Sequence, residues 1–391
     1  MTKIGLLSIL FLFVAAILCP FAQPVQVHTI DELKAAIINA NKGLDPVIEI
    51  EDGEYTIWHL NSLPSLTREG IIIRGISGNR EKVIIQGDPT RWVTHIFKIK
   101  ASDITIQDMT LKTVKHHLIQ VHGEKDADRL LLKNIRFVDA GQQLVKVTAD
   151  RKNKITADQG RVENCWFEYT PEGIESYYIG GIDAHFALDW IVRDNIFVGI
   201  KSPSEQVAEF AVHFWTNSAN TLVERNVIVN CDRGIGFGLG KSRHFGGIIK
   251  NNMIFHDKSK GFGDVGIALE SAVGALVYNN TIFLEHDYPN AIEYRFPGTK
   301  EVVIANNLTN KKIQKRNRGS AEVKNNVTYA KREWFSDPDT GDLHIAKHLH
   351  PVSNTGILLE GLILDFDKKV RDFYSGIDIG ADEFSLLDNE N

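Results

Sequence analysis

The sequence is poor in cysteine, methionine and proline, which contribute 3, 3 and 11 of its 391 residues. So few cysteines exclude a disulfide-dense scaffold, and they form no paired pattern of the kind that binds zinc. Basic residues are outnumbered by acidic ones, 44 to 50, so the net charge of −6 gives no global field that would attract nucleic acid or an anionic membrane. A P-loop and a Gly-x-Ser-x-Gly motif are also absent, which leaves no sign of a nucleotide site or a serine hydrolase.

The first 22 residues have the pattern of a secretory signal peptide. A single charge, Lys3, precedes the apolar run Ile4 to Leu18. Fifteen helical residues would span only about 22 Å, short of the ~30 Å hydrocarbon core of a membrane. We therefore expect cleavage near Ala22, no membrane span, and a secreted or periplasmic protein. Cys19 leaves a lipoprotein anchor as the minor alternative.

A unit of about 27 residues repeats along most of the chain. It consists of an aliphatic residue, polar residues, an asparagine and a further apolar pair, within short stretches rich in β-branched and aromatic residues. Its recurring polar position is occupied by Asp108, Asn134, Asn164, Asn195, Asn226, Asn252, Asn280, Asn307 and Asn326. Such a chain must wind, so that each strand lies parallel to its copy, about 4.8 Å away, in the next turn.

The repeated asparagine has a structural role in this arrangement. Asparagine tolerates left-handed backbone at a corner, and stacked asparagine side chains can hydrogen-bond from turn to turn. The sequons at Asn279, Asn307 and Asn326 are therefore predicted to be corner positions rather than glycan sites. Cys165 and Cys231 fall about two turns apart, roughly 10 Å, so we expect two buried free thiols.

Several segments resemble the right-handed parallel β-helix proteins, which include pectate lyases and the chondroitinase-B and alginate-lyase-like family. The likeness extends from about Val25 to Phe384 and includes Val47–Tyr55, Gly341–His344 and Asp378–Phe384. The fold class that it implies is all-β: a right-handed parallel β-helix solenoid with a short N-terminal cap helix.

Both ends of a solenoid need covering. Thr29 and Glu32 form a capping box that predicts a helix over residues 33–41, stopped by Gly43. The repeat is lost after about Tyr329, so the chain is expected to fold back over the last coil. The predicted organisation is a signal peptide (1–22), a β-helix with its cap (23–330) and a C-terminal capping segment (331–391), in a monomer.

The strand before each corner alternates inward and outward residues, which defines two outward columns. The first contains Gln120, Lys146, Asp183, His213, Gly236, Ala268 and Glu293. The second contains His122, Thr148, His185, Trp215, Gly238, Glu270 and Arg295. Lys146, Asp183 and His213 occupy successive turns, close enough for Asp183 to orient His213 as a general base.

The same face is predicted to bind an acidic polysaccharide. Gly236, Gly238 and Ala268 would leave a bare floor about as long as a sugar ring. Lys241, Arg243 and His244 follow in the next loop and Arg233 precedes the strand, so that positive charge would surround this floor. Simpler roles remain open: His122 and His185 as surface histidines, Trp215 as packing under a loop, and Glu270 with Arg295 as an ion pair.

The residue types fit a uronate lyase. Arg295, Arg233 or Arg243 would neutralise the sugar carboxylate, His213 or Lys146 would remove the C5 proton, and His185 would protonate the leaving oxygen. The remaining substrate contacts would come from Trp215, Gly236, Gly238, Lys241, His244, Glu270 and Glu293. An inverting hydrolase using Glu270 and Glu293, about 8 Å apart, is the rival reaction. A uronate epimerase is a third possible enzyme on this fold, and a non-catalytic glycan-binding or structural β-helix is the non-enzymatic reading.

The resemblance leaves the subclass and the cofactor open. Arg295-Phe-Pro297-Gly-Thr-Lys300 is similar to the Arg-x-Pro-x-x-Arg segment of pectate lyases but ends in lysine. The paired aspartates of polygalacturonases and the Asp-Pro-His-Asp motif of mannuronan epimerases are absent. Calcium is common in β-helix lyases, with Asp183, Glu270 and Glu293 as candidate oxygen ligands, but no EF-hand-like loop is present. The cofactor is therefore none, or Ca²⁺.

Overall fold

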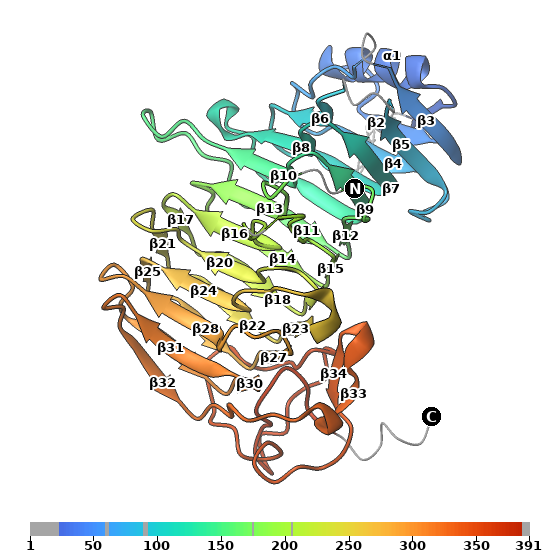
Figure 1. Ribbon diagram of the computed structural model, residues 1–391. Coiled ribbons are helices and arrows are strands. Elements are labelled where there is room, and N and C mark those ends of the chain that lie inside the picture. Colours follow the sequence, from blue (N-terminus) through green and yellow to red (C-terminus); the bar gives the residue numbers. More distant parts are fainter. Residues whose placement is uncertain (1–22, 59–61, 89–92, 174–175, 205, 385–391) are drawn as a thin grey trace, which may run out of the picture.

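The computed structural model describes residues 23–58, 62–88, 93–173, 176–204 and 206–384. The predicted signal peptide lies outside these ranges. Within them the chain forms a parallel β-solenoid of about ten turns, with one α-helix at its N-terminal end (Figure 1). No helix in the described part of the chain is both long enough and apolar enough to cross a bilayer.

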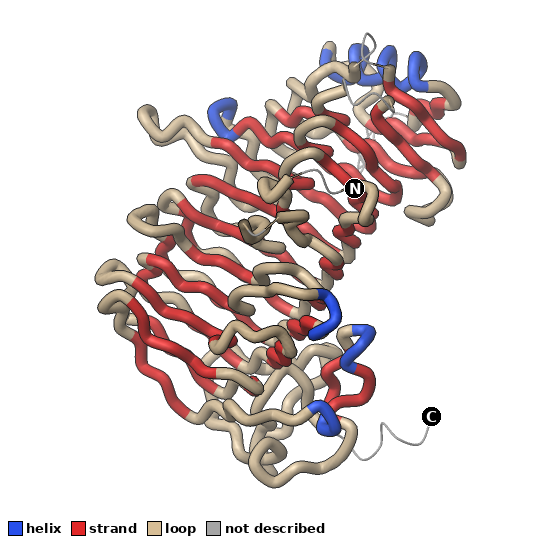
Figure 2. The backbone as a smooth tube through the Cα atoms, viewed as in Figure 1, coloured by secondary structure: helices blue, strands red, loops and turns tan. Residues whose placement is uncertain are grey.

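Two parallel sheets form the walls of the coil (Figure 2). The nine-stranded sheet contains β6 (His95–Ile99), β8 (His117–His122), β10 (Gln143–Thr148), β13 (Gly180–His185), β16 (Val212–Trp215), β20 (Ile235–Phe237), β24 (Ile267–Glu270), β28 (Asn290–Arg295) and β31 (Lys312–Arg316). The twenty-stranded sheet contains β1 (Val25–Val27), β2 (Val47–Ile50), β3 (Gly53–Ile57), β4 (Ile72–Gly75), β5 (Val83–Gly87), β7 (Thr105–Val114), β9 (Leu131–Ala140), β11 (Arg161–Glu163), β12 (Trp166–Glu168), β14 (Ile191–Arg193), β15 (Ile196–Val198), β18 (Leu222–Glu224), β19 (Val227–Val229), β22 (Ile248–Lys250), β23 (Met253–His256), β26 (Leu276–Tyr278), β27 (Thr281–Leu284), β29 (Val302–Ala305), β30 (Leu308–Thr309) and β32 (Ala321–Lys324).

Shorter elements complete the fold. A three-stranded ladder joins β17 (Ser218–Ala219), β21 (His244–Phe245) and β25 (Ala272–Val273), and β33 (Phe335–Asp337) pairs antiparallel with β34 (Asp342–Ile345). The 3₁₀ turns are η2 (Gly123–Lys125), η3 (Lys258–Lys260), η4 (Arg332–Trp334) and η5 (Pro338–Thr340).

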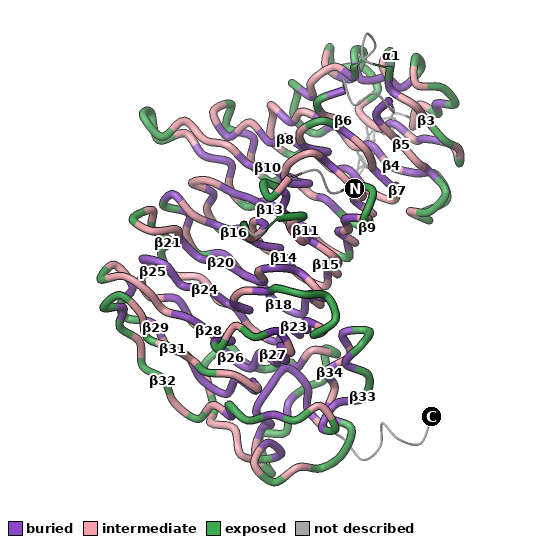
Figure 3. Tube along the Cα trace, viewed as in Figure 1, coloured by how far each residue is buried: buried purple, intermediate pink, exposed green. Residues whose placement is uncertain are grey.

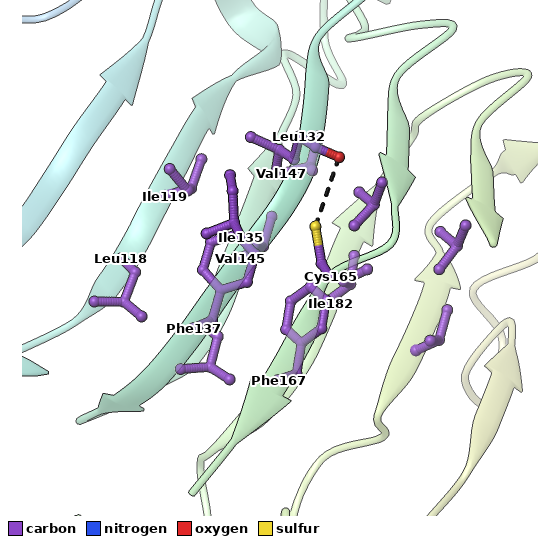
Figure 4. Close-up of a cluster of buried hydrophobic side chains, with 14 of the residues drawn as sticks. Leu118, Ile119, Leu132, Ile135, Phe137, Val145, Val147, Cys165, Phe167 and Ile182 are labelled. Carbon is purple, nitrogen blue, oxygen red and sulfur yellow. Dashed lines mark hydrogen bonds between the residues drawn. The ribbon is translucent and has the colours of Figure 1, made fainter. Parts of the chain in front are cut away.

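The interior is a stack of apolar side chains (Figure 4), and buried residues recur along the coils of the solenoid (Figure 3). Phe137, Phe167 and Phe197 lie on successive turns, with ring centroids 4.6 and 4.5 Å apart. Cys165 and Cys231 are buried and unbridged, and burial raises the pKa of each thiol to about 12. The prediction of two free thiols is confirmed.

The predicted cap helix is confirmed as α1 (Ile30–Asn41). Thr29 is its N-cap, and the Thr29 hydroxyl accepts from the Glu32 amide at 3.2 Å. The Glu32 carboxylate accepts from the amide of His28 rather than from that of Thr29. Leu33, Ile37 and neighbouring alanines are buried against the first coil, so the helix closes the apolar end of the solenoid.

The repeated asparagines occupy two columns rather than one. Asn195, Asn226, Asn252, Asn280, Asn307 and Asn326 form a continuous ladder, in which each amide nitrogen donates to the next side-chain oxygen at 2.9 Å. The left-handed backbone belongs to the residue before each of them, such as Asn251 (φ 53°) and Asn279 (φ 48°).

The assignment of Asn164 to the same column as Asn195 is therefore wrong by one residue. Asn164 is itself left-handed (φ 55°), and Cys165 is the residue level with Asn195. Of the three sequon asparagines, Asn279 is a left-handed corner residue and Asn307 and Asn326 belong to the ladder; Asn279 and Asn307 are completely buried and Asn326 is partly buried, so all three have structural positions.

The segment after Tyr329 lies along one flank of the solenoid. It forms a second apolar cluster, in which Trp334, Phe335 and Leu343 pack beside Phe255 and Phe283 of the twenty-stranded sheet. Its backbone carbonyls also accept hydrogen bonds from corner asparagines, as Leu364 does from Asn251.

Candidate functional site

The register of the nine-stranded sheet brings the two predicted columns together. Lys146 pairs with Asp183, Asp183 with His213, and His213 with Gly236. The second column has the same regularity, since His185 pairs with Trp215 and Glu270 with Arg295. Both columns lie on the outer face, because the residues between them, such as Ala184 and Phe214, are fully buried in the core.

Asp183 is the centre of a compact polar cluster. Its Oδ2 atom pairs with the Nζ atom of Lys146, and its Oδ1 atom accepts from the indole nitrogen of Trp215 at 2.7 Å. The Nε2 atom of His185 lies 3.6 Å from Oδ2 of Asp183 and 2.9 Å from Nζ of Lys146. Four residues that the sequence placed on one face therefore form one cluster of direct contacts.

The pKa of Asp183 is held well below its ordinary value. Burial acts to raise it, but the hydrogen bond from His185 and the positive charge of Lys146 outweigh that effect. The carboxylate is therefore ionised throughout the physiological range, and it holds Lys146 and His185 in place.

His185 has hydrogen-bond donors on both sides of its ring. Lys146 Nζ faces Nε2 at 2.9 Å, whereas the Nη2 atom of Arg151 lies 3.0 Å from Nδ1 and the Thr216 hydroxyl 3.1 Å from it. A neutral imidazole accepts at only one nitrogen. Lys146 is already paired with Asp183, so the exposed guanidinium of Arg151 is the donor that remains available to an anionic ligand.

An open hollow adjoins this cluster. It has a volume of about 690 Å³ and is lined by Gln120, His122, Glu124, Thr148, Ala149, Asp150 and Arg151. Glu124 accepts from His122 Nδ1 at 2.6 Å and from the Thr148 hydroxyl at 2.8 Å. Arg151 is exposed and joins the hollow to His185, so a ligand in the hollow can contact the cluster.

His213 lies on the predicted face but not at its surface. Its side chain is 1% exposed, between the rings of Phe210 and Trp215 at 4.7 and 5.3 Å. Its Nε2 atom lies 3.1 Å from the Gly238 carbonyl and must donate to it, and burial lowers its pKa to about 4, with the charge of Asp183 offsetting part of the shift. The prediction that His213 contacts substrate as a base is therefore wrong for this conformation, because a covered ring cannot reach a sugar.

The bare glycine floor is also absent from the surface. A Cβ atom on Gly236 would lie 3.0 Å from Phe210 and from His213, so the missing side chain makes room for the phenyl ring. Gly238 has φ +75°, and a Cβ there would approach the Glu270 carbonyl to 1.9 Å. Ala268 is 3% exposed in the same apolar patch. These small residues serve packing and backbone geometry, not sugar binding.

His244 is an interior residue, so its assignment to a charged wall is wrong. It is fully buried, its ring stacks on Phe237 at 3.9 Å, and its Nε2 atom contacts the Thr221 hydroxyl at 3.0 Å. Burial lowers its pKa to about 3. Lys241 and Arg243, in the same loop, lie closer to the surface.

This burial predicts a loss of stability in acid. The unfolded chain takes up a proton at His244 near pH 6.5, but the folded chain does so only near pH 3. Stability should therefore fall as the pH drops through this window, by about 1.4 kcal/mol per pH unit for one such group. Urea unfolding at several pH values should show a shallower pH dependence for His244→Phe than for wild type. If the unfolding free energy of His244→Phe has the same pH dependence as that of wild type, the assignment to His244 is wrong. The matched control is His350→Gln, because His350 is exposed.

The remaining predicted residues lie away from the cluster. Arg295 stands four strands from Asp183, about 19 Å at ~4.8 Å per strand, and pairs with Glu270 at 2.9 Å, which confirms the simpler ion-pair role. Glu293 is 1% exposed and is bound by Tyr288, Asn290 and Arg316. The guanidinium of Arg233 lies 4.6 Å from the ring centroid of Phe210.

The three carboxylates considered for calcium are already occupied by protein donors. Asp183 is bound by Lys146 and Trp215, and Glu270 by Arg295 and the Gly240 amide. Hydrogen-bonded carboxylates of this kind do not provide an open oxygen cage. A group with the spacing that a metal ion needs occurs elsewhere, at His344, Asp367 and Asp382.

Some residues of the site carried no sequence signal. Arg151 and Phe210 lie outside the strands, where no alternation indicates direction. Glu209, whose pKa is raised by burial, lies 3.9 Å from the Nδ1 atom of His213. Only the closeness of Arg151 to Thr148 in the chain could have drawn attention to it.

The fold and this outer face together define a parallel β-helix protein. No protein-family model matches the sequence, and no curated protein matches it significantly. The solved structure of pectate lyase Pel9A is similar with a TM-score of 0.57 and 15% identity, covering 88% of this chain and 90% of that one. PfbA, a surface adhesin of Streptococcus pneumoniae, has a TM-score of 0.50 and 13% identity, with coverages of 78% and 89%.

An alginate lyase from Paenibacillus sp. str. FPU-7 is also similar, with a TM-score of 0.40 and 12% identity over 78% of this chain and 98% of that one. At such low identities the comparisons show the shared fold alone. That fold is common to a pectate lyase and to an adhesin, so the function has to be argued from the site.

Proposed function

We propose that this protein is a secreted or periplasmic lyase that cleaves an acidic, uronate-containing polysaccharide by β-elimination. The observation that carries the proposal is the exposed guanidinium of Arg151, which lines an open hollow and contacts His185, the neighbour of Lys146. A sugar carboxylate is an anion of suitable size for that position, and the hollow has room for the ring that bears it.

The proposed reaction uses the cluster as follows. Arg151 binds the carboxylate and stabilises the charge that develops when C5 loses its proton. His185, neutral in the resting site, accepts the C5 proton, and Lys146, 2.9 Å from its Nε2 atom, donates a proton to the leaving oxygen; transfer of the proton from His185 to Lys146 then restores the pair. The C5 electrons form the C4=C5 double bond as the C4–O bond breaks, and Asp183 holds Lys146 in place.

The rival hydrolase is less well supported. An inverting hydrolase needs two accessible carboxyl groups. Glu270 and Glu293 are 8% and 1% exposed, and each is bound by an arginine. An epimerase would begin with the same proton abstraction, and product analysis would distinguish it.

A non-catalytic polysaccharide-binding protein is the second candidate. It is favoured by the low exposure of the Lys146 and Asp183 side chains, 11% and 5%, because groups already paired in the resting protein can bind an anion without exchanging protons with it. A tight complex without product would support this candidate.

The test is an assay of the purified protein on a panel of uronate polysaccharides, following the ultraviolet absorbance of the unsaturated product. We expect Arg151→Ala to lower kcat/KM by about 10²- to 10³-fold, the cost of removing one preorganised donor to a developing oxyanion. Lys152→Ala is the matched control, because Lys152 is the exposed neighbour in the same loop, and it should retain wild-type activity.

Each outcome of this assay has a defined meaning. New reducing ends without the absorbance would replace the lyase by a hydrolase. Epimerised polymer would indicate an epimerase, and binding alone would indicate the second candidate. Equal activity in Arg151→Ala and Lys152→Ala would remove Arg151 from the site.

A further inference from the structure

Three segments of the C-terminal part bring a histidine and two aspartates together. His344 lies in β34, Asp367 in the loop that follows Phe366, and Asp382 near the end of the described chain. One ligand atom from each lies within 4.8 Å of the others, and Nε2 of His344 is 3.2 Å from Oδ1 of Asp367. The group is far along the chain from the candidate site, and the proposed function makes no use of it.

The orientation of His344 is fixed by a fourth residue. Its Nδ1 atom contacts Oδ1 of Asp342 at 2.5 Å, and the same carboxylate oxygen accepts from the His344 amide at 3.0 Å. Nδ1 donates to Asp342 and Nε2 donates to Asp367, so a metal ion bound at Nε2 would displace one proton. Histidines that bind metals are commonly held in this way, with the second ring nitrogen donating to a carboxylate.

A buried carboxylate next to this group lacks a full set of partners. Asp365 is completely buried, and its Oδ2 atom has no hydrogen-bond partner among the described residues, although Oδ1 accepts from the Lys369 amide. An unpaired buried carboxylate oxygen is costly, and a cation bound beside it would relieve that cost.

Two cations act on Asp365, Lys369 and Arg371. Lys369 also lies 3.5 Å from Asp367, on the exposed side of the group. Arg371 is hydrogen-bonded to Glu383, to Asn251 and to backbone carbonyls. The carboxylates of Asp342, Asp365, Asp367 and Asp382 outnumber the cations around His344.

We propose that His344, Asp367 and Asp382 bind a divalent transition metal ion, with zinc favoured, which ties β34 to the two segments that follow it. One imidazole nitrogen and two carboxylate oxygens are ligands that Zn²⁺ prefers, and water can complete its tetrahedral shell. Calcium takes six to eight oxygen ligands and has little use for a nitrogen. The site would serve stability, because it joins segments that have few regular strands of their own.

Metal binding is tested on the full chain, first treated with a chelator and then dialysed. We expect one equivalent of Zn²⁺ to bind in calorimetry and to raise Tm by about 2 to 5 °C at a hundredfold excess over Kd, with a smaller effect of Ca²⁺. Addition of Co²⁺ should give the visible absorption of a low-symmetry site, and Zn²⁺ should abolish it. The absence of both a Tm shift and a cobalt spectrum would overturn the proposal without any substitution.

Variants locate the site. His344→Gln and Asp382→Asn should each lose the Tm response to Zn²⁺, whereas the exposed His350→Gln should keep it. If His344→Gln retains the full response, the metal binds elsewhere and the assignment is wrong. Because the readouts are stability and binding, a failure here leaves the lyase proposal untouched, and the converse also holds.

Discussion

Replacing Asn252 by leucine is expected to lower the free energy of unfolding by about 3 to 5 kcal/mol. Asn252 is completely buried in the middle of the ladder. Its amide nitrogen donates to Asn280 and to the carbonyls of Val223 and Lys250, and its oxygen accepts from the backbone and side chain of Asn226. Leucine has a similar volume but leaves these groups unpaired, at about 1 to 3 kcal/mol each when buried. Urea unfolding followed by circular dichroism would measure the loss.

The matched control is Asn79→Leu. Asn79 is exposed, and its side chain makes one local hydrogen bond, to the Glu81 amide at 3.0 Å. We expect this change to stay within about 0.5 kcal/mol of wild type. If Asn252→Leu changes the free energy of unfolding as little as Asn79→Leu does, the asparagine ladder does not stabilise the solenoid.

The winding and its register could be predicted because both follow from side-chain periodicity. A shift of one residue would have exposed Ile182 and Val212 and buried Asp183, so the aliphatic pattern allowed one alignment of the strands. The corners were harder to predict. The left-handed position and the ladder position are adjacent, and asparagine suits both, which is why Asn164 was aligned with Asn195 when it belongs beside Asp194.

The site was predicted only as far as the strands extend. Alternation placed Lys146, Asp183 and His185 side by side on the outer face. It gave no information about the loops, and Phe210, which lies just before β16, covers both Gly236 and His213. Small residues in an outward column can therefore leave space for a ligand or for a side chain from a loop. Only the three-dimensional path of the loop decides between them.

Asp183→Asn is expected to cost about 3 to 5 kcal/mol, because it leaves Lys146 charged and poorly solvated without its partner. The pKa of Asp183 lies well below the value of an unfolded aspartate, so the ion pair contributes stability above about pH 4 and loses it as the pH falls through the folded-state pKa. The variant should accordingly lose less stability than wild type between neutral and acid pH. Thermal unfolding across this range would measure both effects.

The double variant Lys146→Met/Asp183→Asn separates stability from chemistry. With both charges removed, the methionine can fill the space of the lysine stem, and the Trp215 indole can still donate to the amide oxygen of the new asparagine. Replacing a buried ion pair by neutral groups is often nearly neutral, so most of the loss in Asp183→Asn should be recovered. Lyase turnover should remain absent, because Lys146, the proposed proton donor to the leaving oxygen, is gone. If the double variant is as unstable as Asp183→Asn, the Asp183 carboxylate stabilises the sheet through its own hydrogen bonds. If the double variant has lyase turnover, Lys146 takes no part in the proposed mechanism.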